Sequence, residues 1–470
     1  MNQKSTALHS AVASLERAAD RASGTVAVPG NAVRLLFDGP EIYPAMFAQI
    51  AGAKRRIHFE NYIFRHDATG QQFADALIAR AKEGITVRVL YDWLGSFSTP
   101  RSFWRRMTEA GIEVRVFGPP RLRDPLAFII RDHRKVMVID GDRGITGGHC
   151  IGDEWAGDPE QDQRPWRDTA VELSGPAARV LDQAFIRVWG KSGGSAIDDG
   201  VEVGPEVAEA GDLMVRVVAT EPGDQRASRT MEMLLGVGAE RIWVTEPYLA
   251  GARRVFQVLE DASRDGVDVR LLMPGASDVT VVRNLSRTGY RRLLRSGVRL
   301  WEWGGSMLHA KTLSVDSRWV RVGSSNLNPS SLIANWELDV FVDSPELSQE
   351  FEQKYLEDLS ESSEVVARDR NRLPFSRWQV PQAIVATAPA KERQAHRPGK
   401  FERRRNAFLR AAVLANGAKA ALFGPLALIL LAFAAFLVIF PRVAAYTTAA
   451  IAALSGITLL ITTLARRPRG

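Results

Sequence analysis

The order of apolar and polar positions along the chain repeats between its two halves. Residues 73–92 and 255–274 each show a helical spacing of apolar positions, then a glycine and a short apolar run typical of a strand. The same helix–strand order returns at 103–117 and 289–303. Strands that alternate with helices indicate βαβ units, and hence a mostly parallel sheet that helices cover on both faces. The pattern therefore predicts an α/β fold.

The repeat also predicts how the chain divides into domains. We expect two homologous α/β domains at residues 30–200 and 205–375, packed as a pseudo-dimer. We interpret residues 1–29 as an N-terminal extension, and we expect no signal peptide there because residues 1–25 are polar and mixed. Residues 376–410 combine an Ala- and Pro-rich linker with a basic segment.

Two long uncharged stretches follow the basic segment. Residues 420–440 and 443–464 are each long enough to cross a bilayer as a helix, and only Pro441 and Arg442 separate them. We therefore predict a transmembrane helical hairpin over 418–465. Buried core helices are the alternative, but these stretches lie close to the C-terminus between basic flanks. Basic residues at both outer ends predict that both ends, and the body before them, face the cytoplasm.

The charge of the chain is unevenly distributed. The whole chain carries a formal net charge of +7. Residues 391–470 hold 13 Lys or Arg and 2 Glu, so residues 1–390 are mildly acidic, with a net charge of −4. An acidic body argues against a surface that follows the phosphates of a nucleic acid, so we expect no nucleic-acid partner.

A short polar motif occurs twice, once in each half. Residues 133–140 read HRKVMVID and residues 309–316 read HAKTLSVD, and a glycine-containing turn starts fourteen residues after each histidine. The motif residues form the candidate catalytic set: His133, Lys135, Asp140, His309, Lys311 and Asp316. The turn residues that we single out are Gly147, Gly148 and Cys150 in the first half and Gly323, Ser324 and Asn326 in the second.

These residue types suit the chemistry of a phosphodiester. Side chains two apart on a strand share a face, so each histidine projects beside its lysine. One imidazole can attack phosphorus while the other protonates the departing alkoxide, and the ammonium groups offset the charge on the phosphoryl oxygens. Glycine in the turns lets backbone N–H groups approach an anion. The two aspartates end their strands in turns, where they can orient neighbours without touching substrate. The lysines supply the positive charge, so we expect neither a metal nor a cofactor.

The motifs resemble those of the phospholipase D superfamily. More narrowly, HRKVMVIDG…TGGHCIGDEW, PWRDT and HAKTLSVD…VGSSNLNPSSLIANWELDV resemble bacterial cardiolipin synthases, over about residues 33–375. The resemblance implies two phospholipase D-like domains whose histidines meet in one cleft. It also implies a covalent phosphohistidine, with His133 as the attacking residue by analogy and His309 as general acid and then base.

The resemblance further implies roles for two carboxylates and for lipid substrates. Asp168 and Glu337 match the acidic residues that fix the histidine tautomers in the family. The expected partners are phospholipids, above all phosphatidylglycerol, and the lipid bilayer. The implied location is the bacterial cytoplasmic (inner) membrane. The sequence leaves the oligomeric state open.

Some residues depart from the pattern or allow a second interpretation. The family has Asn where this chain has Cys150, and a thiol is a poorer donor than an amide. His149, Asp153 and Glu154 could suggest a metal site, but three such groups in one loop are weak evidence. Glu60 and Glu246 match each other in the repeat and could line the cleft, although we prefer a local capping or pairing role.

Several functions remain compatible with this sequence. The first is a phosphatidyltransferase that makes cardiolipin from two phosphatidylglycerol molecules and releases glycerol. The second is a hydrolase that passes the same intermediate to water and gives phosphatidic acid. A nuclease shares the motifs but fits poorly with an acidic body. A non-catalytic lipid-binding adaptor rests on Cys150 alone.

Overall fold

The computed structural model describes residues 14–120, 130–193, 197, 207–278 and 280–366. The first half contains β1 (Val28–Phe37), α2 (Asp38–Ala51), β2 (Arg56–Asn61), α3 (Ala68–Lys82), β3 (Thr86–Asp92), α4 (Arg101–Glu109), β4 (Glu113–Phe117), β5 (Lys135–Ile139), β6 (Arg143–Gly147), α5 (Asp153–Ala156), the 3₁₀ turn η1 (Pro159–Gln161), β7 (Thr169–Ser174) and α6 (Pro176–Lys191). The second half contains β8 (Leu213–Thr220), α7 (Arg226–Val237), β9 (Arg241–Thr245), α8 (Arg253–Arg264), β10 (Asp268–Pro274), α9 (Thr280–Arg295), β11 (Arg299–Trp303), β12 (Thr312–Val315), β13 (Trp319–Gly323), the π-helical turn η2 (Ser330–Ala334), β14 (Glu337–Asp343), α10 (Pro345–Ser360) and β15 (Ser362–Val365).

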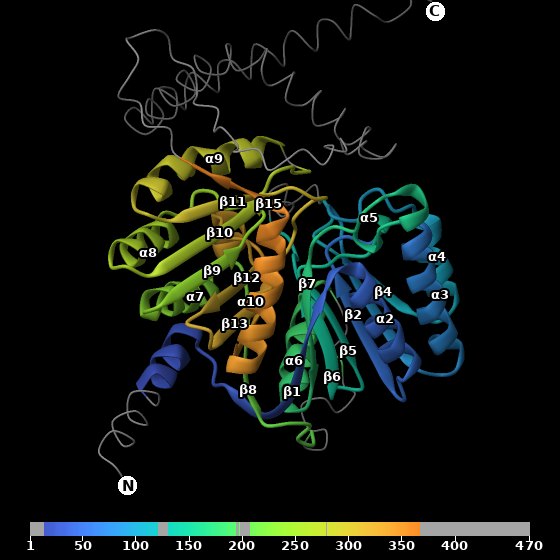
Figure 1. The fold of residues 1–470 in the computed structure, drawn as a ribbon. Coiled ribbons are helices and arrows are strands. Elements are labelled where there is room, and N and C mark those ends of the chain that lie inside the picture. The colour runs from blue at the N-terminus through green and yellow to red at the C-terminus, as the bar shows by residue number, and fades with distance from the viewer. Residues whose placement is uncertain (1–13, 121–129, 194–196, 198–206, 279, 367–470) are drawn as a thin grey trace, which may run out of the picture. The chain divides into compact units, whose positions relative to one another are not determined.

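The strands of both halves form one sheet. Its 15 strands run in the order β15-β11-β10-β9-β12-β13-β14-β8-β1-β7-β6-β5-β2-β3-β4 (Figure 1). β8 and β1 pair at the centre, and the strands on either side of them follow in equivalent order. The repeat in the sequence is therefore a repeat in the fold, and the two halves join through their first strands.

The direction of the strands differs from the expectation. β2, β3 and β4 are parallel, as are β9, β10 and β11, because α3, α4, α8 and α9 connect them. The strands between these two groups are antiparallel. A mostly parallel sheet was therefore a wrong expectation. The Asp140–Asp142 turn joins β5 to β6 as a hairpin, and hairpins connect antiparallel strands.

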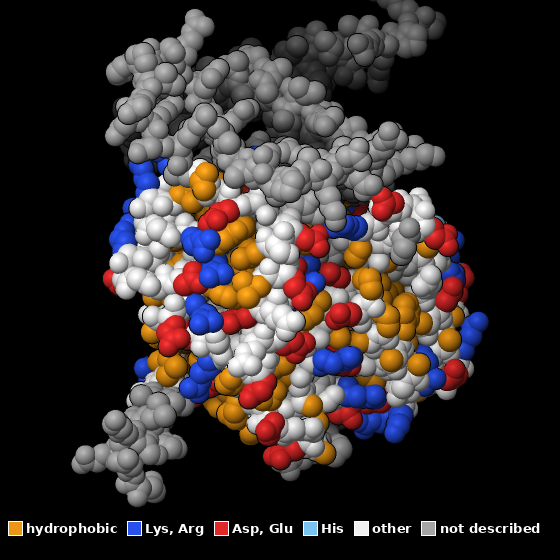
Figure 2. Space-filling view, viewed as in Figure 1, with side chains coloured by type: hydrophobic (Ala, Val, Ile, Leu, Met, Phe, Trp, Pro, Cys, Tyr) orange, Lys and Arg blue, Asp and Glu red, His pale blue; other side chains and the backbone are white. Residues whose placement is uncertain are grey.

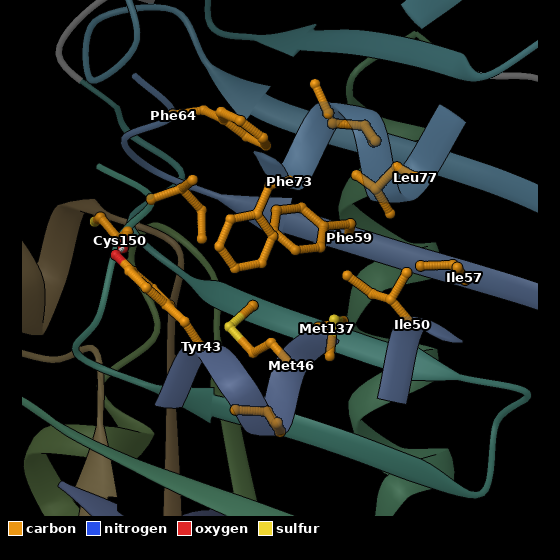
Figure 3. Packing of buried hydrophobic residues seen from close by; sticks show 14 of the residues in the cluster. Tyr43, Met46, Ile50, Ile57, Phe59, Phe64, Phe73, Leu77, Met137 and Cys150 are labelled. Carbon is orange, nitrogen blue, oxygen red and sulfur yellow. Dashed lines mark hydrogen bonds between the residues drawn. The ribbon is translucent and has the colours of Figure 1, made fainter. Parts of the chain in front are cut away.

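Helices cover both faces of the sheet, as the apolar pattern predicts. In β5, Met137 and Ile139 pack into a core with α2 and α3, whereas Val136 and Val138 pack into a second core with α6. Figure 3 shows part of the first of these cores, built around Phe59 and Phe73. Because every side chain of β5 is buried, the strand that carries Lys135 is fixed from both sides.

One core belongs to both halves. Leu35 and Leu173 of the first half share it with Leu338 and Phe351 of the second. The chain before β1 also contacts the second half, because Arg216 of β8 forms ion pairs with Glu16 and Asp20 of the helix at 14–23. The halves therefore fold against each other as the pseudo-dimer expected from the repeat.

The predicted transmembrane hairpin at 418–465 lies outside the described residues, as does the segment from 376 to 410. Within the described residues, no helix combines the length and the apolar character needed to cross a bilayer.

Candidate active site

The two His-x-Lys pairs lie at the same end of equivalent strands. Lys135 begins β5, and Lys311 directly precedes β12. Both lysine side chains are buried, and each ammonium group donates a hydrogen bond to the carbonyl oxygen of the histidine two residues before it. His133 and His309 keep 9% and 5% exposure. The lysine side chains are thus fixed in the interior, whereas the imidazoles next to them keep a small exposure to solvent.

Each histidine segment borders the other half of the molecule. The backbone N–H of His133 donates to the carbonyl of Trp336 at 3.0 Å, and Asp132 forms a bridge with Trp336. In the same way, the N–H of His309 donates to the carbonyl of Arg167 at 2.7 Å. The residue after Trp336 is Glu337, and the residue after Arg167 is Asp168. Backbone pairing between the halves therefore delivers a carboxylate to each histidine.

Those carboxylates bind the imidazoles across the two halves. Nδ1 of His133 lies 3.0 Å and 3.1 Å from the two carboxylate oxygens of Glu337, and Nδ1 of His309 lies 2.7 Å from Oδ2 of Asp168. Burial raises the pKa of each carboxyl group, but the bound histidine and the nearby lysines lower it more, so both pKa values fall below the usual range. An ionised carboxylate on Nδ1–H leaves Nε2 unprotonated and free to react.

Other side chains hold the two carboxylates. Oδ2 of Asp168 accepts a hydrogen bond from the indole N–H of Trp155 at 3.0 Å, and Oδ1 accepts one from the Thr169 N–H at 2.8 Å. Oε2 of Glu337 accepts one from the hydroxyl of Ser324 at 2.6 Å. Ser324, singled out in the sequence as a turn residue, thus supports a carboxylate.

The electrostatics bring the four motif side chains into one site. Burial lowers the pKa of His309 to about 4, and both Lys311 and Lys135 lower it as well. Burial likewise lowers the pKa of His133, Glu337 opposes this, and Lys135 and Lys311 add to it. Each imidazole therefore feels the lysines of both halves. These effects keep both rings neutral at neutral pH, which is the state that a nucleophile requires.

Two N–H groups of the glycine-containing turns are bonded within the fold. The Gly148 N–H donates to the carbonyl of Thr169 at 3.1 Å, and the Ser324 N–H donates to that of Leu338 at 2.9 Å, so neither is available to an anion. The glycines instead give room to carboxylates. A Cβ on Gly148 would lie 2.2 Å from Oδ1 of Asp168, and one on Gly323 would lie 1.9 Å from Oδ1 of Asp339. Gly147 is equally confined, since a Cβ there would lie 2.4 Å from the Thr169 carbonyl oxygen.

The fourth turn residues differ between the halves. Cys150 is fully buried in the first-half core, where the hydroxyl of Tyr43 donates to its carbonyl at 2.7 Å (Figure 3). Burial raises the pKa of its thiol. Asn326 is also buried, and its amide nitrogen lies 3.4 Å from the hydroxyl of Ser331. Its Oδ1 accepts no hydrogen bond from the described part of the chain.

Asp140 and Asp316 lie away from the imidazoles, which corrects their place in the catalytic set. Asp140 accepts hydrogen bonds from the N–H groups of Lys54, Arg55 and Arg56 at the start of β2. Asp316 accepts them from the three residues at the start of β9. Each is five residues beyond its lysine, about 17 Å along a strand. Both residues have positive φ angles, 56° and 52°, so they form the turns that end the strands.

The strand register changes which residues of the repeat are equivalent. Asn61 of β2 pairs with Lys135, and Thr245 of β9 pairs with Thr312, so the next residue, Glu246, lies across from Lys311. Asn61 and Glu246 are therefore counterparts, and the match between Glu60 and Glu246 is wrong by one position. Glu60 instead binds Arg134 at 2.7 Å.

Sequence reasoning missed two kinds of contact around the histidines. The ring of Tyr62 lies edge-on to His133 with 4.8 Å between centroids, and Tyr248 lies 6.2 Å from His309. Both tyrosines occur in the sequence as Glu-x-Tyr, after Glu60 and Glu246, but no role was predicted for them. Trp155 was not singled out, although it follows directly on Asp153 and Glu154. Those two acids bind the N–H of Thr69 and the guanidinium of Arg65. Within the described residues, no three His, Cys, Asp or Glu side chains converge as metal ligands.

Comparisons with known proteins agree with this geometry. A family model described as "Cardiolipin synthase, PLD-like domain" matches residues 46–157 and 234–359. Cardiolipin synthase 2 of Bacillus cereus is 34% identical over 362 residues, which are 75% of this chain and 69% of the relative. Cardiolipin synthase A of Pseudomonas aeruginosa is 33% identical over 353 residues, 74% of this chain and 71% of the relative.

A solved structure shares the fold. Phosphatidylserine synthase from Haemophilus influenzae superposes with a TM-score of 0.58 at 17% identity, over 75% of this chain and 92% of that chain. At that identity the likeness concerns the fold alone.

Proposed function

Because the chain belongs to the cardiolipin synthase family of phospholipase D-like proteins, we propose that it is a phosphatidyltransferase that makes cardiolipin from two phosphatidylglycerol molecules. The observation that carries the proposal is that each histidine is hydrogen-bonded to a carboxylate from the other half of the chain. Each imidazole is oriented by an ionised carboxylate of the other half and feels both buried lysines. Such an arrangement suits two successive displacements at one phosphorus.

In the first displacement, Nε2 of His133 attacks the phosphorus of one phosphatidylglycerol. The bond from phosphorus to the glycerol oxygen breaks, His309 protonates that oxygen, and free glycerol leaves. His309 must be protonated for this step. Burial and the two lysines lower its pKa to about 4, and the incoming phosphodiester anion raises it. Lys135 and Lys311 offset the charge that develops on the phosphoryl oxygens.

In the second displacement, a hydroxyl of another phosphatidylglycerol takes the place of the departed glycerol. His309, now neutral, accepts the hydroxyl proton as the oxygen attacks phosphorus. The phosphorus–nitrogen bond breaks, and His133 returns to its starting state. The products of the cycle are one cardiolipin and one glycerol.

We further propose that the enzyme works at the bacterial cytoplasmic membrane. Both substrates are membrane lipids, and the sequence at 418–465 has the length and basic flanks of a transmembrane hairpin with a cytoplasmic body. Within the described residues, the face in Figure 2 shows acidic and basic side chains interspersed, without a continuous basic tract. That distribution supports a lipid substrate over a nucleic acid.

A hydrolase remains the second candidate, because it would use the same intermediate. The test is to incubate the full chain with phosphatidylglycerol vesicles and to separate the lipid products. We expect cardiolipin and glycerol in equal amounts. Phosphatidic acid as the sole phospholipid product would replace the transferase with the hydrolase.

A further inference from the structure

One buried ionisable residue beside the catalytic residues has no role in the mechanism above. His149, the third residue of the first-half turn, is 1% exposed. Its Nδ1 has no hydrogen-bonding partner among the described residues. A buried polar atom without a partner calls for an explanation, and at a reaction centre a ligand can supply it.

The position of His149 connects it to both halves of the site. Gly148, the residue before it, lies so close to Oδ1 of Asp168 that a Cβ would not fit between them. Asp168 is the carboxylate that binds His309. The ionisable groups that act on the His149 ring are Asp168, Lys135 and His309. In the proposed mechanism Lys135 and His309 act on the substrate, and Asp168 orients His309. Cys150, by contrast, belongs to the apolar core (Figure 3).

His149 does not serve to hold a catalytic carboxylate. The hydrogen bonds that the described residues give to the Asp168 side chain come from His309, Trp155 and Thr169. The equivalent turn residue in the second half is Ser325, whose hydroxyl is satisfied by Oδ2 of Asp339 at 2.6 Å. The two turns therefore differ within the described residues: the third residue is internally bonded in the second half, whereas in the first half its Nδ1 has no partner.

We propose that the imidazole of His149 is a neutral hydrogen-bond donor to a nonbridging oxygen of the substrate phosphodiester. In the first-half turn it would give the hydrogen bond that the buried thiol of Cys150, the fourth residue, cannot give. In the second-half turn the fourth residue is Asn326, which keeps an amide. The inference rests on the proposed phosphodiester chemistry.

The electrostatics of the site favour a neutral donor at this position. Burial lowers the pKa of His149 to about 4, and Lys135 and His309 lower it while Asp168 raises it. The ring is therefore uncharged at neutral pH and still carries one N–H. A phosphodiester anion has acceptors only, so it can satisfy this N–H. A neutral donor stabilises the phosphoryl oxygen without adding a cation that would further depress the pKa values of the two catalytic histidines.

The test replaces the donor and compares oxygen with sulfur at phosphorus. His149→Phe keeps a flat buried ring but has no N–H. Ser325→Ala is the matched control, because it changes the same turn position in the half where the side chain is internally bonded. Total glycerol release is measured for phosphatidylglycerol and for its two phosphorothioate diastereomers, so that transfer and hydrolysis both count.

We expect His149→Phe to lower kcat/KM for the oxygen substrate about 10- to 100-fold. Its loss should be several-fold smaller for the one diastereomer that places sulfur, a weak acceptor, against residue 149. Ser325→Ala should lower all three rates by a common factor. An equal loss on all three substrates for His149→Phe, or no loss, would overturn the proposal.

Two further measurements keep the outcome clear. His149→Ser, which copies the second-half turn, repeats the comparison if the phenylalanine variant does not fold. Tungstate binding by calorimetry needs no turnover, and we expect it to weaken about tenfold in the His149 variants and to stay unchanged in Ser325→Ala. Unchanged tungstate affinity in the His149 variants would contradict the donor. Phosphatidic acid in place of cardiolipin would contradict the proposed function alone.

Discussion

The two half-sites reach the same geometry with different residues. In the first half, Gly148 leaves space for the short side chain of Asp168, which reaches across to His309. In the second, Ser324 occupies the equivalent turn position and binds the longer Glu337, which reaches across to His133. The turn residue and the length of the carboxylate thus vary together. What the halves have in common is the position of an ionised oxygen at Nδ1, and not the side chain that supplies it.

The surroundings of the lysines differ more. Across from Lys135 stands the neutral Asn61, and across from Lys311 stands the carboxyl of Glu246. Among the residues that the structure describes, neither Oδ1 of Asn61 nor Oε2 of Glu246 has a hydrogen-bonding partner. Burial lowers the pKa of Lys311 to about 8 and raises that of Glu246 to about 7. The second half-site therefore holds groups that titrate near neutral pH, and its charge is more sensitive to pH.

The largest expected effect is the loss of turnover when either histidine is replaced, and a second substrate distinguishes the roles of the two. His133→Ala and His309→Ala should each lower turnover of phosphatidylglycerol about 10⁴-fold or more, because neither displacement is complete with one imidazole. With a p-nitrophenyl phosphodiester, whose leaving group needs no acid, His309→Ala should still form a covalent adduct that mass spectrometry detects. His133→Ala should form none. The reverse pattern would exchange the two roles, and normal turnover in either variant would contradict a paired site.

The second-largest effect is expected at the two carboxylates that bind the histidines. Asp168→Asn and Glu337→Gln should each lower kcat about 1000-fold, because an amide can donate to the imidazole and so favours the wrong tautomer. Steady-state kinetics with phosphatidylglycerol vesicles measures this, and unchanged melting temperatures would show that the fold is intact. If only one of the two variants lost activity, the halves would not be equivalent in mechanism.

Glu246→Gln tests the difference between the surroundings of the two lysines through the free energy of unfolding. Burial raises the pKa of Glu246 from its usual 4.5 to about 7 in the folded chain, so its stabilising contribution is complete below pH 4.5 and is lost as the pH rises to 7. The wild type should therefore lose on the order of 3 kcal/mol, relative to the variant, between pH 4.5 and 8. Urea unfolding at the two pH values measures this. Asn61→Asp should create a similar loss in the first half, and a pH-independent difference would refute the assignment.

Lys311 predicts an alkaline limit to activity. The site requires its ammonium group, so kcat/KM should fall about tenfold per pH unit once the pH exceeds about 8. Lys311→Arg keeps the charge at every pH tested, so any activity that this variant retains should not fall in this way at alkaline pH. A wild-type profile that stays flat to pH 10 would show that Lys311 remains charged.

The smallest effect belongs to the aspartates of the motif. Asp140→Asn and Asp316→Asn each remove charge from a cluster of backbone hydrogen bonds, so the free energy of unfolding should fall by about 1–2 kcal/mol. Turnover at 25 °C should stay within about twofold of the wild type. A loss of activity without a loss of stability would return these residues to the catalytic set.

Much of the site could be predicted from the sequence, because its chemistry is carried by short motifs. His133, Lys135, His309 and Lys311 identify themselves by duplication, and Asp168 and Glu337 by resemblance. The crossing of the carboxylates could not be predicted, since it depends on backbone pairing between residues about 140 to 200 positions apart. The turn at Asp140–Asp142 did carry a signal for an antiparallel hairpin that the helix–strand alternation obscured.

The misplaced equivalence of Glu60 and Glu246 has a simple physical cause. Both occur as Glu-x-Tyr, but the second half reaches its tyrosine one residue later in the strand register. A shift of one residue on a strand moves a side chain to the opposite face. Glu60 therefore binds Arg134, whereas Glu246 lies across from Lys311.

A crystal structure of the chain with tungstate would test most directly whether both half-sites act on one phosphorus. We expect a single tungsten atom per chain, in contact with Nε2 of His133 and Nε2 of His309 and near both lysine ammonium groups. Two separate tungstate ions, each bound by one histidine, would contradict the account.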